Sequence, residues 1–258
     1  MTTLPAASPV SPEAPAPIAH PSRVQRVRHE LKRREVVVAR VETLSPHFRS
    51  VTFAGDALAD FLSASFDDHV KFMLDRPGGE RVMRDYTPRR FDAAQRELTL
   101  EFALHGEGPA ADWARHAKPG DRATIGGPRG SFIIPLDYAW HLLVGDETAL
   151  PAIARRLEEL PPDARVTVLL QADAADQRQF SRSAHTRVQW LDSGEQLVAA
   201  VRALALPPGE GYAWCAGEAR LVAQLRSILV AEKGHDRHAI RAAAYWKQGA
   251  AAHHENLE

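Results

Sequence analysis

Residues 141–152 read HLLVGDETALPA, and the rhythm of the chain changes at this point. The apolar residues 141–145 predict a short buried strand, and residues 150–160 fit a helix. Downstream, strands are expected at 166–170, 188–191, 212–216 and 240–246, and helices at 196–204 and 221–232. Alternation of strands with helices predicts a parallel α/β sheet of the nucleotide-binding type.

Upstream of this point the pattern is short and alternating. Strands are expected at 36–41, 48–53, 69–74, 81–90 and 97–105, and one helix at 109–117 with Pro109 at its first position. Turn residues separate these runs, as in Pro119-Gly120-Asp121 and Gly126-Gly127-Pro128. The pattern predicts a six-stranded antiparallel β-barrel over 34–136, followed by the α/β domain over 137–258.

Residues 1–33 differ in composition from both domains. Residues 1–21 are rich in Ala and Pro, which predicts a disordered tail, and they lack the pattern of a secretory signal. The basic stretch 23–34 is expected to be a solvated lead-in, with a nucleic-acid or membrane arm as the less favoured alternative. We therefore expect a cytoplasmic protein.

Composition excludes several classes of protein. The net charge of −1 gives no overall field that would recruit nucleic acid. The single cysteine, Cys215, excludes an intrachain disulfide framework and a metal site built on several thiolates. No apolar run approaches the roughly 18 residues of a membrane span.

The first motif is Arg84-Asp85-Tyr86-Thr87, within an expected barrel strand. Alternation places Arg84 and Tyr86 on one face and Asp85 and Thr87 on the other. Neighbouring Arg and Tyr side chains can hold a phosphate and cover a flat ring. The alternative is a cross-strand aromatic residue beside an exposed arginine.

The second motif, His105-Gly106-Glu107-Gly108-Pro109-Ala110, runs from a strand through glycines into a helix. Free amides at a helix N-terminus bind anions, and a pyrophosphate would fit. The alternatives are an ordinary turn and, for His105, a buried core histidine.

Two further motifs follow strands of the predicted sheet. Asp146, Glu147 and Thr148 come directly after the first strand, where open α/β sheets bind ligands, and Thr148 is a candidate helix cap. Cys215-Ala216-Gly217-Glu218 ends the fourth strand, and the thiol would border a bound ring or be a small buried hydrophobic group. There is no G-x-G-x-x-G fingerprint, and the absence of a P-loop argues against an NTPase.

In this order, the four motifs resemble the siderophore-interacting protein family. That family is a branch of the ferredoxin–NADP reductase superfamily, in which an FAD-binding barrel precedes an NAD(P)H-binding domain. The resemblance covers about 34–249 and includes the closing sequence Tyr245-Trp246-Lys247-Gln248-Gly249. It implies an NAD(P)H-dependent, FAD-containing reductase that acts on ferric siderophores or other ferric chelates and releases Fe(II).

The resemblance also implies roles for individual residues. Arg84 would pair with an FAD phosphate, Tyr86 would pack on the flavin, and Thr87 would lie near flavin N5. The remaining cofactor-binding residues that it implies are Asp85, His105, Gly108, Pro109, Ala110, Asp146, Glu147, Thr148, Cys215, Gly217, Glu218 and Trp246. Thr87 and Lys247 are the candidate catalytic residues, with Lys71, Arg89 and Arg90 as further cations for an anionic chelate. Ala110 stands where the superfamily usually has a hydroxyl or thiol.

The expected chemistry needs a flavin, because a nicotinamide gives up two electrons together whereas ferric iron accepts one. No metal site of the protein's own is expected. Two alternatives stay open: a general NAD(P)H:flavin or ferredoxin-type reductase, and a siderophore-binding protein without enzymatic activity. The choice between NADH and NADPH is also open, since Arg178 favours a 2′-phosphate while Asp173 and Asp176 disfavour it.

Overall fold

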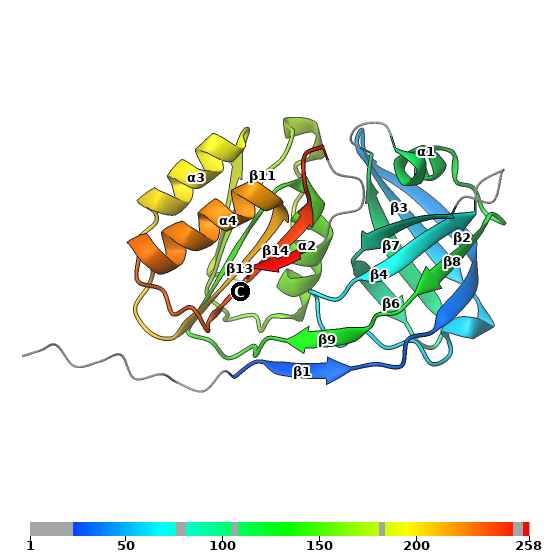
Figure 1. The fold of residues 1–258 in the computed structure, drawn as a ribbon, viewed down its shortest axis with the longest axis horizontal. Helices are drawn as coiled ribbons and strands as arrows, with labels where there is room; N and C mark the ends of the chain where they lie inside the picture. The colour runs from blue at the N-terminus through cyan, green and yellow to red at the C-terminus, as the bar shows by residue number, and fades with distance from the viewer. Residues whose placement is uncertain (1–22, 76–80, 105–107, 181–183, 250–254, 258) are drawn as a thin grey trace, which may run out of the picture.

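The computed structural model describes residues 23–75, 81–104, 108–180, 184–249 and 255–257. These residues form two domains side by side, a barrel-like antiparallel sheet and an α/β sheet (Figure 1). The predicted fold class is therefore confirmed. Among the described residues, no helix is long and apolar enough to cross a membrane.

The first domain is a seven-stranded sheet in the order β5-β4-β8-β2-β3-β7-β6, and every pairing in it is antiparallel. Its strands are β2 (Arg33–Ser45), β3 (Phe48–Ala54), β4 (Val70–Asp75), β5 (Arg81–Tyr86), β6 (Pro88–Asp92), β7 (Glu97–Ala103) and β8 (Arg122–Gly126). A short 3-10 helix, η1 (Asp56–Leu58), follows β3, and α1 (Pro109–His116) contacts β3, β5 and β7.

The count of seven strands, where six were expected, comes from a bend at Thr87. One strand was expected over 81–90, but β5 pairs with β4 whereas β6 pairs with β7. Pro88 has no N–H to continue the first ladder. The two halves of this stretch thus belong to opposite edges of the sheet, and Thr87 lies where they meet.

Most of the basic lead-in is exposed or half-buried, but Arg34 is buried and the segment has regular structure. Strand β1 (Gln25–Arg28) pairs with β9 (Gly130–Ile133) in a separate two-stranded sheet, and all four β1 residues are exposed. Arg23, just before β1, forms ion pairs with Asp137 and Glu210. The predicted disorder of residues 1–21 lies outside the described residues.

The second domain is a six-stranded sheet in the order β12-β11-β10-β13-β14-β15, parallel except for β15. Its strands are β10 (Trp140–Gly145), β11 (Val166–Gln171), β12 (Thr186–Leu191), β13 (Gly211–Glu218), β14 (Ile240–Trp246) and β15 (Glu255–Leu257). Its helices are α2 (Leu150–Glu159), α3 (Gly194–Ala203) and α4 (Ala219–Ser227), with short turns η2 (Glu147–Ala149) and η3 (Ala174–Asp176). The helix expected over 221–232 ends as a π-helical turn, η4 (Ile228–Glu232).

Helices cover both faces of this sheet, with α3 and α4 on one face and α2 on the other (Figure 1). Strand β13 shows how the sequence divides between the two cores. Tyr212 and Trp214 face the α2 side, whereas Ala213 and Cys215 face α3 and α4. Both faces of the strand are buried, which explains its continuous apolar sequence.

The two domains share one apolar core. Phe66 of the first domain packs against Trp214 of the second, with ring centroids 5.3 Å apart. Buried Asp67 accepts hydrogen bonds from Trp214 Nε1 at 2.8 Å and from Arg241 Nε at 2.9 Å. Arg155 on α2 donates to the carbonyl oxygen of Pro88 at 2.8 Å. The position of the domains is therefore fixed by packing and by hydrogen bonds.

Candidate active site

On the barrel side, Arg84 and Tyr86 lie on the same face of β5, as predicted from alternation. The Tyr86 ring lies 4.3 Å from that of Phe102, and burial raises the pKa of its phenol. Arg84 Nη1 donates to the carbonyl oxygen of Met83 at 2.8 Å, and no carboxylate among the described residues pairs with it. Its guanidinium therefore keeps donors that can bind a phosphate.

Asp85 and Lys71 face the other side of the sheet and form an ion pair there, with Nζ and Oδ2 2.7 Å apart. The Asp85 carboxylate thus has a protein partner on the face opposite Arg84 and Tyr86. For the same reason Lys71 is a poor candidate for recruiting an anionic chelate.

The N-terminus of α1 is open to a ligand. Its cap residue Gly108 has an extended backbone, with φ −175°, and the N–H groups of its first turn donate to no capping side chain among the described residues. A Cβ atom at Gly108 would meet no atom of a described residue within 4 Å, apart from its chain neighbours. Pro109 occupies the first turn and Ala110 is buried, while His105 lies outside the described residues.

Thr87 is buried at the bend between β5 and β6, and its side chain is hydrogen-bonded to Tyr245 on β14. Burial raises the pKa of the Tyr245 phenol. Tyr245 was not among the predicted site residues, although it precedes Trp246 in the closing sequence. The bond joins the barrel to the parallel sheet at the residue expected to lie near flavin N5.

These barrel-side groups fit an FAD molecule. Arg84 and the uncapped end of α1 supply positive charge and N–H donors for a pyrophosphate, and α1 contacts β5. Tyr86 supplies an aromatic ring beside Thr87 for the flavin end. Arg84 forms no ion pair with a described residue that FAD binding would have to break.

At the carboxyl edge of the parallel sheet, the Asp146 side chain is 1% exposed and receives four hydrogen bonds. Oδ1 accepts from Thr148 N at 3.0 Å and from the Thr148 hydroxyl. Oδ2 accepts from Glu218 N at 2.8 Å and from Trp246 Nε1 at 2.9 Å. Burial raises the pKa of Asp146 even though these hydrogen bonds favour its ionised form.

Gly217 allows this arrangement because it has no side chain. A Cβ atom there would collide with the Asp146 carboxylate, and its φ of +144° suits glycine. The motifs around Asp146, Gly217 and Trp246, separate in sequence, therefore form one constellation.

The prediction that Thr148 caps a helix is wrong. The cap of η2 is Asp146, and Thr148 is the donor to it. Glu218 caps α4, since its Oε2 accepts from Arg220 N at 2.7 Å and Leu221 N at 3.0 Å. The carboxylates of Asp146 and Glu218 therefore each accept hydrogen bonds from backbone N–H groups of the protein itself.

Cys215 is completely buried among residues of α3 and α4, and burial raises the pKa of its thiol to about 12. This burial favours the alternative interpretation, a small hydrophobic core residue. Glu147 differs, because it is only partly buried. Burial, together with the Asp146 charge, raises the pKa of Glu147 to about 7.

The candidate cations differ in what they already bind. Arg89 forms ion pairs with Glu101 and Glu158, and Arg178 lies 2.6 Å from Glu101. Arg90 lies 3.9 Å from Glu158. Lys247 is exposed and forms no ion pair with any described residue. It is therefore the candidate whose charge is most available to a substrate.

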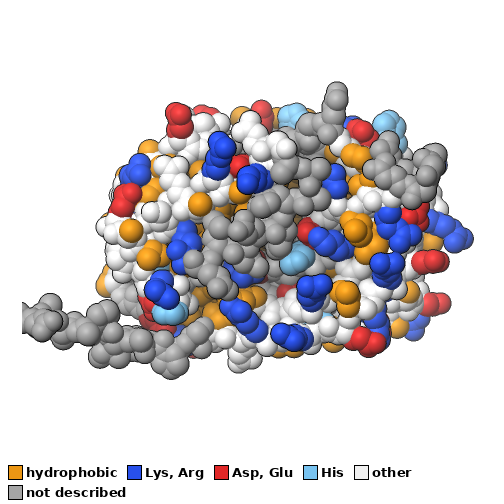
Figure 2. Space-filling model, in the orientation of Figure 1, with side chains coloured by type: hydrophobic (Ala, Val, Ile, Leu, Met, Phe, Trp, Pro, Cys, Tyr) orange, Lys and Arg blue, Asp and Glu red, His pale blue; other side chains and the backbone are white. Residues whose placement is uncertain are grey.

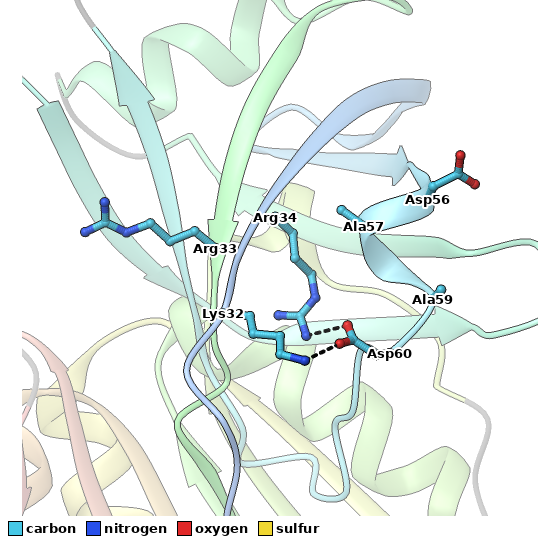
Figure 3. A pocket seen from close by; sticks show the side chains of 7 residues that line it. All are labelled: Lys32, Arg33, Arg34, Asp56, Ala57, Ala59 and Asp60. Atoms are coloured by element: carbon cyan, nitrogen blue, oxygen red, sulfur yellow. Dashed lines mark hydrogen bonds and ion pairs between the residues drawn. The ribbon is translucent and has the colours of Figure 1, made fainter.

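The surface carries many basic side chains, and one surface pocket lies apart from the motifs. Figure 2 shows many Lys and Arg side chains over the barrel and over β1 and β9. A pocket of about 470 Å³ lies between the start of β2 and η1. In it, Lys32 and Arg34 point toward Asp60, which accepts from both (Figure 3). The pocket contains none of the predicted site residues.

Comparison with known proteins first identifies the class. Residues 37–82 and 75–132 match the profile of the siderophore-interacting FAD-binding domain, and 138–249 match that of siderophore-interacting protein. A siderophore utilization protein from T. fusca superposes with a TM-score of 0.83 at 34% identity, over 92% of this chain and 99% of that one. The structure thus contains an FAD-binding domain joined to the second domain of the same family.

Individual relatives agree with this class. An NADPH-dependent ferric-chelate reductase of Escherichia coli is 37% identical over 88% of this chain and 97% of its own length. The ferric vibriobactin reductase of Vibrio cholerae is 31% identical over 81% of this chain and 88% of its own length. This chain belongs to the siderophore-interacting protein family, which confirms the predicted family and the predicted FAD-binding domain.

Proposed function

We propose that the protein is an NAD(P)H-dependent, FAD-containing reductase of ferric siderophores or other ferric chelates. The proposal is carried by the combination of Arg84 with the N-terminus of α1, because among the described residues Arg84 has no acidic partner and α1 has no side-chain cap. Within a domain of the FAD-binding family, these groups supply what a pyrophosphate needs. The relatives from Escherichia coli and Vibrio cholerae are named as reductases of ferric chelates, which extends the proposal to the substrate.

Bound FAD would take two electrons from the nicotinamide and supply them singly to ferric iron. Siderophore oxygens are hard ligands that prefer Fe(III), so reduction weakens the complex. The protein's part is to hold the reactants. Arg84 and the N-terminus of α1 would bind the phosphates, and Tyr86 and Thr87 would lie beside the flavin. The proposed location is the cytoplasm, where NAD(P)H and imported siderophores meet.

The test uses the purified full-length protein. We expect it to be yellow and to release FAD, because FMN has no pyrophosphate for α1 to bind. Anaerobic addition of NADPH or NADH should bleach the flavin absorbance, and a ferric siderophore should restore it while an Fe(II) chelator develops colour. Running both nucleotides in parallel decides the preferred donor.

The competing functions give different results in the same assay. A general flavin or ferredoxin-type reductase would reduce free flavin or an iron–sulfur protein without preference for ferric chelates. A siderophore-binding protein would bind the chelate but would be colourless, would not take up added FAD and would not oxidise NAD(P)H. Either result would overturn the proposed function.

A further inference from the structure

The closing segment, residues 245–248, is attached to the rest of the molecule at three points. Tyr245 is hydrogen-bonded to Thr87 of the barrel. Trp246 Nε1 donates to Asp146 Oδ2 at 2.9 Å, and Gln248 N donates to Glu218 Oε1 at 3.4 Å. The attachments reach the barrel, the end of β10 and the start of α4, so the segment lies where the two domains meet.

The closing segment contains a β-bulge in its pairing with β13. Ala244 pairs with Gly217 and Trp246 pairs with Glu218, so Tyr245 is an extra residue in the ladder. Such a bulge changes the direction of the side chains that follow it, and bulges often occur beside active sites. Lys247 lies between two attached residues, is exposed, and bonds to no described residue itself.

The bonding of Asp146 determines what this carboxylate can do. An ionised carboxylate has about four acceptor positions. Here Oδ1 accepts two hydrogen bonds from Thr148, and Oδ2 accepts from Glu218 N and Trp246 Nε1. No acceptor position is left for a nucleotide, and burial excludes contact with a substrate.

We infer that Asp146 is a positioning residue, which fixes the Trp246 indole and with it the closing segment, so that Lys247 is presented at the junction of the two domains. The inference rests on the proposed function for the role of Lys247 toward an anionic ferric chelate. Its structural part, the fixing of Trp246 by Asp146, is independent of any activity. Gly217 belongs to the same device because only glycine leaves room for the Asp146 carboxylate.

The structural part is tested with holoenzyme that carries ¹⁵N-labelled tryptophan. Trp246→Phe identifies the indole N–H signal of Trp246 by its loss. In Asp146→Asn this signal should shift, and its exchange with solvent should speed up about tenfold, equivalent to about 1.4 kcal/mol. Asp236→Asn is the matched control, because exposed Asp236 accepts from the backbone N–H two residues ahead, as Asp146 does. An unchanged Trp246 signal in Asp146→Asn would overturn the inference.

The kinetic part asks whether Asp146 acts through Lys247. Asp146→Asn should raise KM for an anionic ferric chelate by no more than Lys247→Ala does, about two- to threefold, and it should have little further effect in a Lys247→Ala background. Effects that multiply fully would show that the two residues act separately and would also overturn the inference. If Asp146→Asn does not fold, Trp246→Phe makes the same kinetic test, since it removes the N–H donor to Asp146 and keeps an aromatic ring. A protein without reductase activity would refute the proposed function but leave the indole result intact.

Discussion

Arg84 and Asp146 are charged residues from motifs of similar prominence, yet the structure uses them in opposite ways. Among the described residues, Arg84 donates only to one backbone carbonyl, whereas buried Asp146 accepts from four donors. The Arg84 charge on the barrel side is therefore available to a ligand. On the sheet side, the Asp146 carboxylate holds three chain segments together through hydrogen bonds. Whether a motif residue can bind a ligand or supports the fold depends on the hydrogen-bond and ion-pair partners that it already has in the structure.

The largest expected effect is on cofactor binding. Arg84→Ala should weaken FAD binding by about 1.5–3 kcal/mol, because a charge-assisted contact to a phosphate is lost. Flavin fluorescence during equilibrium dialysis measures the change. Arg81→Ala on the same strand is the control, since Arg81 is paired with Asp75. Equal FAD affinity in both variants would mean that Arg84 is an ordinary surface residue.

The second prediction tests the scaffold side. Gly217→Ala should lower the free energy of unfolding by about 2 kcal/mol, because the new methyl group meets the Asp146 carboxylate and the backbone is in a region suited to glycine. Urea denaturation followed by circular dichroism measures it. Gly120→Ala is the control, with φ +94° but no atom within 4 Å of the new Cβ. If both variants lose the same stability, the contact with Asp146 contributes nothing.

A smaller effect depends on pH and concerns Glu147. The folded protein holds the Glu147 proton more tightly than the unfolded chain, since its pKa rises from 4.5 to about 7. Its contribution to stability is therefore complete below about pH 4.5 and is lost as the pH rises through 7. Glu147→Gln stays neutral, so it should be more stable than the wild type by about 1 kcal/mol at pH 8, with little difference at pH 4.

Urea titrations at the two pH values measure this difference. Exposed Glu35→Gln provides the comparison for a change of overall charge. A gain for Glu147→Gln that is the same at pH 4 and pH 8 would contradict the prediction.

The smallest expected effect is on substrate capture. Lys247→Ala should raise KM for an anionic ferric chelate about two- to threefold, because an exposed charge contributes about 0.5 kcal/mol. A neutral hydroxamate chelate should change less, and added salt should slow only the anionic reaction. Initial rates at several salt concentrations make the comparison. Identical changes for both chelates would remove Lys247 from the substrate path.

Much of the fold could be predicted because local patterns determine it. The period-two runs of the barrel and the apolar strands of the second sheet agree with the structure to within a few residues at most ends. The short strands β1, β9 and β15 were not expected. Strand β1 illustrates the reason, since all four of its residues are exposed and it has no apolar face that alternation could reveal.

The site was predictable as a set of motifs but not as a set of bonds. The sequence places Asp146 and Glu218 at strand ends, where ligands usually bind, and that position suggested nucleotide contacts. It does not show that the backbone N–H of Glu218 and the indole of Trp246 converge on one carboxylate, because those partners are separated by 72 and 100 positions. The same limit hid the bond between Tyr245 and Thr87.

The shared core between the domains bears on how such reductases can be recombined. The two family profiles match 37–132 and 138–249 as separate units, which suggests interchangeable modules. Yet Phe66 and Asp67 of the first unit complete the packing and hydrogen bonding of Trp214 in the second. A chimaera that joined this barrel to another reductase's sheet would leave the Asp67 carboxylate buried without its donors. A successful exchange therefore has to include the residues on both sides of this contact, so the two domains have to be exchanged together.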